Sequence, residues 1–181
     1  MTKISSMASL VTMADADLFV IVDDPSGTAV TKAVTALKVA QHNTGFGSIH
    51  VDDNAVTQSM STSYAVITAF GADGAVFNCT AAHGTDRVTV TNAGTYQVCY
   101  QVTASAGSAQ DLKFQIFKNG SALAGTNARE TIVASADMGS ASCNAVVELA
   151  AADYVQLACA TTSGTPAITI VNAQLTVLRV K

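Results

Sequence analysis

The feature that most restricts the fold is a long series of short strand-like runs separated by turn-forming residues. From residue 48 onward, runs rich in Val, Ile, Thr and Tyr alternate with clusters of Gly, Asn, Asp, Ser and Pro. Asn119-Gly120, between two such runs, is a strong hairpin signal because both residues tolerate positive φ. Regular short strands separated by such turn-forming clusters are typical of an all-β sandwich. No helical period and no internal repeat interrupts them, which argues against a propeller or a solenoid.

The expected strands follow from these runs and their separators. They cover residues 48–51, 64–70, 75–79, 87–92, 95–104, 112–118, 132–135, 142–149, 154–160 and 167–180.

Alternation in two of these strands indicates which side chains face the interior. In residues 95–104 the aromatic and Val side chains share one face, whereas the Gln side chains and Cys99 share the other. In residues 112–118 one face holds Leu112, Phe114 and Ile116, and Phe117 falls on the opposite face. We therefore predict that the sandwich core and subunit contacts draw on these strands, and specifically on Tyr96, Val98, Tyr100, Phe114, Ile116, Phe117 and Tyr154.

The composition is unusually poor in charge. Hydrophobic residues make up 49% of the chain and charged residues 12%, whereas charged residues contribute about a quarter of a typical soluble sequence. A membrane span would need about 20 consecutive apolar residues, but the apolar run at 18–22 is short and is flanked by Asp17 and Asp23. No membrane insertion and no secretory signal are expected. The composition instead favours a protein whose surface is buried against its own copies or against partners.

Several chemical functions are not expected. The net charge is −4 and the nine basic residues are scattered, which is unlike a nucleic-acid-binding protein. No nucleophile elbow, zincin helix or phosphate-binding loop occurs, so no catalytic residue, enzyme activity or cofactor is predicted. His83 and Asp86 are interpreted as loop residues, and Asp52-Asp53-Asn54 as an acidic turn that is not a metal site.

The four cysteines give no sign of a ligand set. They are Cys79, Cys99, Cys143 and Cys159, and they form neither a CxxC pair nor zinc-ligand spacing with a histidine. We predict buried free thiols; a disulfide between neighbouring strands is the alternative.

Residues 1–40 differ from the rest. The run Leu18, Phe19, Val20, Ile21 and Val22 predicts a strand, Pro25 lies in a turn, residues 28–34 can return as a second strand, and 35–40 can form a last helical turn. A hairpin alone is marginal in water, so these five residues are predicted to dock onto a partner; an ordinary core strand of the same domain is the alternative. Residues 41–47 are interpreted as a linker to a head at 48–181.

Four motifs then occur in order along the head. Gly94-Thr95-Tyr96 begins a strand, Lys118-Asn119-Gly120 makes a hairpin, residues 147–157 form a strand pair around Asp153, and residues 173–180 close the domain. Their order resembles the C1q/TNF-like jelly rolls. The resemblance implies an antiparallel jelly-roll sandwich and a homotrimer. Ala152 stands where that family usually has Gly, which predicts a turn without positive φ.

The first 40 residues resemble a different element. The stretch from Lys3 to Thr35 is similar to the attachment segment of many phage tail-fibre and appendage proteins. Together the two resemblances imply a bacteriophage virion structural protein, assembled in the host cytoplasm, whose arm binds a tail, baseplate, portal or major capsid protein. The outward head could bind a host cell-surface receptor through loops 105–110, 120–130 and 161–166. A capsid decoration (cement) protein is the alternative, and a secreted C1q-like binding protein is a second one.

Overall fold

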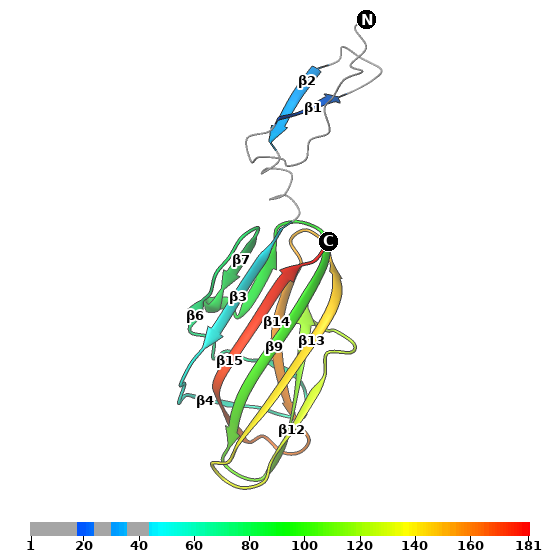
Figure 1. Cartoon of the computed structure of the whole chain (residues 1–181). Helices are drawn as coiled ribbons and strands as arrows, with labels where there is room; N and C mark the ends of the chain where they lie inside the picture. The colour runs from blue at the N-terminus through cyan, green and yellow to red at the C-terminus, as the bar shows by residue number, and fades with distance from the viewer. Residues whose placement is uncertain (1–17, 24–29, 36–43) are drawn as a thin grey trace, which may run out of the picture. The chain divides into compact units, whose positions relative to one another are not determined.

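The computed structural model describes residues 18–23, 30–35 and 44–181, with side chains from Thr44 onward. The chain divides into two compact units, Met1–Asn43 and Thr44–Lys181. In the first unit, β1 (Leu18–Asp23) pairs antiparallel with β2 (Val30–Thr35), and Leu18 lies opposite Thr35 (Figure 1). The predicted strand at 18–22 therefore exists. Most of the helical turn expected at 35–40 lies outside the described residues.

The second unit is a sandwich of two antiparallel sheets (Figure 1). One sheet has the order β13–β9–β15–β3–β6, with β4 beside β15. Its strands are β3 (Phe46–Val51), β4 (Thr57–Ser59), β6 (Ala72–Asp73), β9 (Gly94–Ala106), β13 (Met138–Leu149) and β15 (Ala167–Arg179). The other has the order β11–β10–β14–β8–β7, with β12 beside β10 and β5 beside β14. Its strands are β5 (Ala65–Val66), β7 (Cys79–Ala82), β8 (Arg87–Val90), β10 (Gln110–Lys118), β11 (Ser121–Ala122), β12 (Ala128–Ile132) and β14 (Tyr154–Thr161).

The strand order is that of a jelly roll. The long strands pair as nested couples in the order of the chain: β3 with β15, β8 with β14, β9 with β13, and β10 with β12. This nesting places β3, β9, β13 and β15 in one sheet and β8, β10, β12 and β14 in the other, which is the double Greek-key arrangement of a jelly roll. The all-β class and the antiparallel jelly-roll sandwich expected from the sequence are both present.

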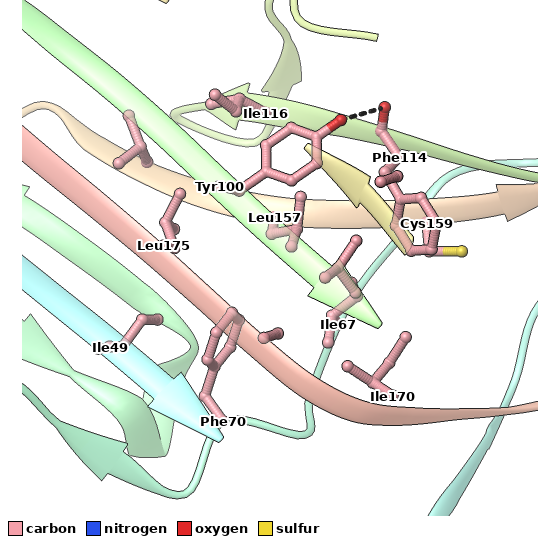
Figure 2. Close-up of a cluster of buried hydrophobic side chains, with 14 of the residues drawn as sticks. Ile49, Ile67, Phe70, Tyr100, Phe114, Ile116, Leu157, Cys159, Ile170 and Leu175 are labelled. Atoms are coloured by element: carbon pink, nitrogen blue, oxygen red, sulfur yellow. Dashed lines mark hydrogen bonds between the residues drawn. The ribbon is translucent and has the colours of Figure 1, made fainter. Parts of the chain in front are cut away.

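The core lies between the two sheets and follows the alternation of the strands. Tyr96, Val98 and Tyr100 of β9 are at most 3% exposed, as are Phe114 and Ile116 of β10. Figure 2 shows Tyr100 among these apolar side chains, where its hydroxyl donates a hydrogen bond of 3.2 Å to the backbone oxygen of Phe114. This bond matters because a buried phenol without a partner would be costly.

The strand boundaries differ from the expected ones at several places. β3 begins at Phe46, inside the expected linker, and β5 keeps only Ala65–Val66 of the expected strand at 64–70. β12 lies at Ala128–Ile132, upstream of the expected 132–135 and inside a segment interpreted as a loop. Its sequence Ala-Arg-Glu-Thr-Ile is mostly polar because β12 lies at the edge of its sheet, where most of its side chains meet water.

The turn between β13 and β14 contradicts one expectation. Ala152 adopts φ +68°, so the positive φ that glycine normally supplies is present although the residue is alanine. The turn persists because Asp153 holds it: the Asp153 carboxylate accepts hydrogen bonds from the Ala150 N–H at 2.7 Å and from Asn119 Nδ2 at 2.6 Å. Asn119 belongs to the hairpin between β10 and β11, so this contact cannot be recognised from the local sequence of the turn.

Replacing Ala152 by glycine should stabilise the head. A left-handed conformation costs an L-residue about 1–2 kcal/mol, and glycine avoids this strain. Glycine is also more flexible in the unfolded chain, which offsets part of the gain in stability. We expect Ala152→Gly to raise the free energy of unfolding by about 0.5–1 kcal/mol in urea denaturation. The matched control is Ala150→Gly, where φ is not positive and the same exchange should lower stability. Equal effects of the two variants would contradict the strain at Ala152.

A candidate interface on the outer face of the β13–β9–β15–β3 sheet

On the outer face of the sheet built from β13, β9, β15 and β3, one register row holds exposed apolar side chains on β3, β15 and β13 and a glutamine on β9. Register places Leu178 opposite Phe46 on one side and opposite Gln97 on the other, and Gln97 lies opposite Val146. Phe46, Leu178 and Val146 are 38, 44 and 67% exposed. Exposed apolar side chains that stand singly are ordinary, but here Phe46 and Leu178 are direct neighbours and only Gln97 separates Leu178 from Val146. We call this row the apolar row.

The rows that follow are polar and uncharged over most of their width. Three successive rows run from β3 to β13 or from β15 to β13: Ser48, Thr176, Cys99 and Asn144; His50, Gln174, Gln101 and Ser142; and Asn172, Thr103 and Ser140. Charged groups lie at the margins of this face, where Glu148 ends β13 and Asp52 follows β3. We call the apolar row together with these three rows the neutral face.

The neutral face is hollowed in its polar half. A hollow of about 770 Å³ is lined by side chains of four strands, among them His50, Gln101, Ser142 and Gln174. On the β13 side its lining consists of small residues, Ser140 to Ser142. Thr103 and Ser140 hydrogen-bond to each other across its floor at 2.9 Å. The Asp52 carboxylate also lines the hollow, and the other polar side chains that line it are uncharged hydroxyl and amide groups and His50. The face can therefore accept a partner mainly through hydrogen bonds.

The thiols of the head are not a reactive or ligating set. All four cysteines are free. Burial raises the pKa of Cys79 to about 11 and that of Cys159 to about 12, so both stay protonated at neutral pH. Burial also raises the pKa of Cys99, which lies within the neutral face. Among the described residues, no group of three or more His, Cys, Asp or Glu could hold a metal ion.

The residues singled out from the sequence fall into three places. Five of them are buried in the core and can affect a subunit contact only by supporting the strands that form it: Tyr96, Val98, Tyr100, Phe114 and Ile116. Phe117 and Tyr154 lie half-buried on the opposite sheet, as members of β10 and β14. The five predicted docking residues, Leu18 to Val22, belong to β1 in the first unit.

The apolar row was missed by reading the sequence. Phe46 was placed in the linker, and Val146 and Leu178 are ordinary members of alternating strands. Only the register brings the three residues to one line, and register between strands far apart in the chain leaves no local sequence signal.

The acidic and histidine residues interpreted as loop residues also lie in turns. His83 belongs to the short 3-10 turn η1 (His83–Thr85), and its Nδ1 lies 3.0 Å from Asp73 Oδ1. The His83 backbone N–H also donates to Asp73 at 2.7 Å, and this bond is the main reason that the pKa of Asp73 is lowered. The pair joins η1 to β6. In the part of the chain that the structure describes, no helix is long and apolar enough to cross a membrane.

Comparison with known proteins gives similarity of architecture at low identity. No protein-family profile and no curated protein matches the chain. Among solved structures, the chain is similar to the Eiger TNF of S. frugiperda, with a TM-score of 0.49, 17% identity, and coverage of 76% of this chain and 94% of that chain. It is also similar to the globular domain of zebrafish complement 1qA protein, with a TM-score of 0.49, 14% identity and coverage of 76% and 98%.

Proposed function

We propose that this chain is a non-catalytic structural protein of a bacteriophage virion, which forms a homotrimer through the neutral face and docks through residues 1–40. The observation that carries self-association is the neutral face itself: four strands wide, with an apolar row at one end and charge only at its margins. Depletion of charge at the centre, with polar and charged groups at the rim, is the composition of protein interfaces rather than of open surface.

The partner proposed for this face is a second copy of the chain. The hollow of this face contains one carboxylate, Asp52, and no cluster of charge that would select an oppositely charged partner. Amide and hydroxyl side chains such as Gln101 and Ser142 can serve as donor or acceptor to their own kind. The edge of the sheet supports this view. β13 is long, lies at the edge, and carries no charged residue from Met138 to Val147, whereas unprotected edges of monomeric sheets are normally blunted by charge or proline.

The virion assignment rests on the first unit. β1 and β2 form a two-stranded sheet, and such a hairpin is marginally stable by itself. The apolar strand Leu18–Asp23 therefore favours an arm that is stabilised by binding another protein, which we propose is a tail, baseplate, portal or major capsid protein. The free thiols of the head are consistent with assembly in a reducing host cytoplasm.

Two alternatives differ in location. A capsid decoration protein would occur in hundreds of copies per particle and a fibre in a few dozen at most, so gel densitometry of purified virions separates them. A secreted C1q-like binding protein would share the self-associating head but would be absent from virions. Finding the chain in culture medium and not in particles would replace the virion proposal with this one.

The proposal is tested by the mass of the purified full chain. Multi-angle light scattering at micromolar concentration should give three times the chain mass of 18.4 kDa. A stable monomer would contradict self-association, and a dimer would contradict threefold closure while leaving the neutral face as the contact.

A further inference from the structure

The outer face of the other sheet carries cations that face one another. Lys113 of β10 lies directly opposite Arg129 of β12 in the antiparallel register. Residues directly opposite in such a pair have Cβ atoms about 4.5–5.5 Å apart, and like charges there are destabilising. The sheet therefore places two positive charges where a sequence selected only for stability would place opposite charges.

Neither cation is neutralised within the head. In residues 44–181, no carboxylate lies within ion-pair distance of Lys113 or Arg129. The nearest acidic residue on the same face of β10 is Asp111, and its carboxylate accepts a hydrogen bond of 2.7 Å from Thr131 Oγ1. The positive charge of the pair is thus available to a group from outside.

Aromatic and amide side chains flank the two cations. The Tyr64 ring lies 5.7 Å from the Phe117 ring at an angle of 55°, and Lys113 Nζ lies 5.6 Å from the centre of the Tyr64 ring. Asn127 Nδ2 donates a hydrogen bond to the Tyr64 hydroxyl. Burial raises the pKa of Tyr64, whereas the positive charge of Arg129 acts on it in the opposite direction.

A third cation continues the pattern on the same sheet. Arg87 of β8 stacks over the Tyr154 ring, with its Cζ 5.0 Å from the ring centre. The Arg87 Nε is buried and has no hydrogen-bond partner in the structure. Cationic and aromatic side chains therefore occur together on this sheet: Arg129 on β12, Lys113 and Phe117 on β10, Tyr154 on β14 and Arg87 on β8.

We propose that this cationic face binds an acidic saccharide. The anionic group of the sugar would accept hydrogen bonds from Lys113 and Arg129, and the half-exposed Phe117 ring would contact the apolar face of the sugar ring. The Nδ2 of Asn127 and the Nε2 of Gln115 already donate to Tyr64 Oη and to the Leu123 carbonyl, so their amide oxygens would accept from the sugar hydroxyls. Charge-assisted bonds to an anion are the strong ones, and an extended acidic chain would also reach Arg87. A neutral sugar would leave the two opposed charges unrelieved.

The cationic face stays accessible when the neutral face of the other sheet is buried by self-association. Because the neutral face and the cationic face lie on opposite sides of the sandwich, self-association through the first leaves the second open. This proposal rests on the proposed function, in which the head contacts the host surface. Binding of the saccharide, however, requires only the head. A monomeric protein that binds acidic sugars would contradict the trimer and support this site, so the two can fail separately.

Titration of the full chain with three related sugars tests the proposal. Sialyllactose supplies a carboxylate, sulfated lactose supplies a sulfate ester, and lactose supplies neither. We expect calorimetry to detect at least one acidic sugar, with lactose about tenfold weaker or more, which corresponds to about 1.4 kcal/mol. The acidic sugar that binds more tightly identifies the source of the anion. Binding should weaken as salt is raised.

Substitutions then locate the site. Lys113→Gln and Arg129→Gln should each weaken binding of the acidic sugar about tenfold, whereas Lys181→Gln removes the same charge at the chain terminus and should leave binding unchanged. Because the opposed charges repel each other, Lys113→Gln should also unfold at an equal or higher temperature in low salt. Equal affinity for lactose and the acidic sugars, no binding of any of them, or unchanged binding by both variants would overturn the proposal.

Discussion

Leu178→Glu is expected to convert the assembled protein into a monomer. Leu178 lies in the middle of the apolar row, between Phe46 and Gln97, and is 44% exposed in the single chain. Glutamate is tolerated at such an exposed position before assembly. In a homo-oligomer, however, each copy would bring an uncompensated carboxylate into the contact, which costs several kcal/mol per charge. We expect a shift of the dissociation constant of at least about a hundredfold, measured by light scattering over a concentration series.

Two valines show whether an added charge weakens assembly only within the neutral face or anywhere on the surface. Val146 belongs to the apolar row and is 67% exposed, whereas Val133 follows β12 and is 73% exposed outside the neutral face. Val146→Glu should weaken assembly, and Val133→Glu should not. Thermal unfolding of each variant checks that the fold is kept. If both variants assemble as well as the unaltered chain, the neutral face is not the contact.

The core could be predicted from the sequence because its signal is local. Alternation with a period of two assigns Tyr96, Val98 and Tyr100 to one face without knowledge of any partner strand. The structure places these residues, with Phe114 and Ile116, between the sheets. The Asn119-Gly120 hairpin is equally local: φ is +51° at Asn119 and +77° at Gly120, as a type I′ turn requires.

Both candidate surfaces depended on register, which the sequence does not encode locally. Leu178 meets Phe46 although the two are near opposite ends of the head sequence. Arg129 meets Lys113 only because β12 returns along β10 after a segment that reads as a polar loop. Strand β12 was placed too far downstream, and with that error the opposed cations could not be recognised. Pairing between distant strands is fixed by the assembled core, so it emerges only in three dimensions.

The positive φ of Ala152 could not be predicted from the sequence for a different reason. A local rule associates positive φ with glycine, and the rule failed because a tertiary contact overrides it. The stabilising group is Asp153, whose partners Lys118 and Asn119 belong to the hairpin between β10 and β11. The motif order along the chain was informative, whereas the reason that the turn tolerates alanine lies in contacts between two hairpins.

Asp153→Ala is expected to destabilise the head by about 2–4 kcal/mol. The carboxylate lies 2.8 Å from Lys118 Nζ, accepts from Asn119 Nδ2 and the Ala150 N–H, and is only 13% exposed. Its removal leaves three donors without their acceptor at a largely buried site, and each lost charge-assisted bond costs about 1–3 kcal/mol before the remaining groups relax. Urea denaturation measures the loss. Asp153→Asn is the matched control: it keeps the shape and one acceptor but removes the charge, and should lose about half as much.

The same carboxylate should make stability depend on pH in acid. The bonds from Lys118 and Asn119 lower the pKa of Asp153 from 3.8 to about 2. A carboxyl group whose pKa is lower in the folded state stabilises the fold above its unfolded pKa, and this contribution disappears as pH falls through the folded value. We therefore expect about 1–2 kcal/mol of stability to be lost between about pH 4 and pH 2, after allowance for screening by solvent. In Asp153→Asn this part of the acid dependence should vanish; an unchanged acid transition in that variant would show that other carboxylates govern it.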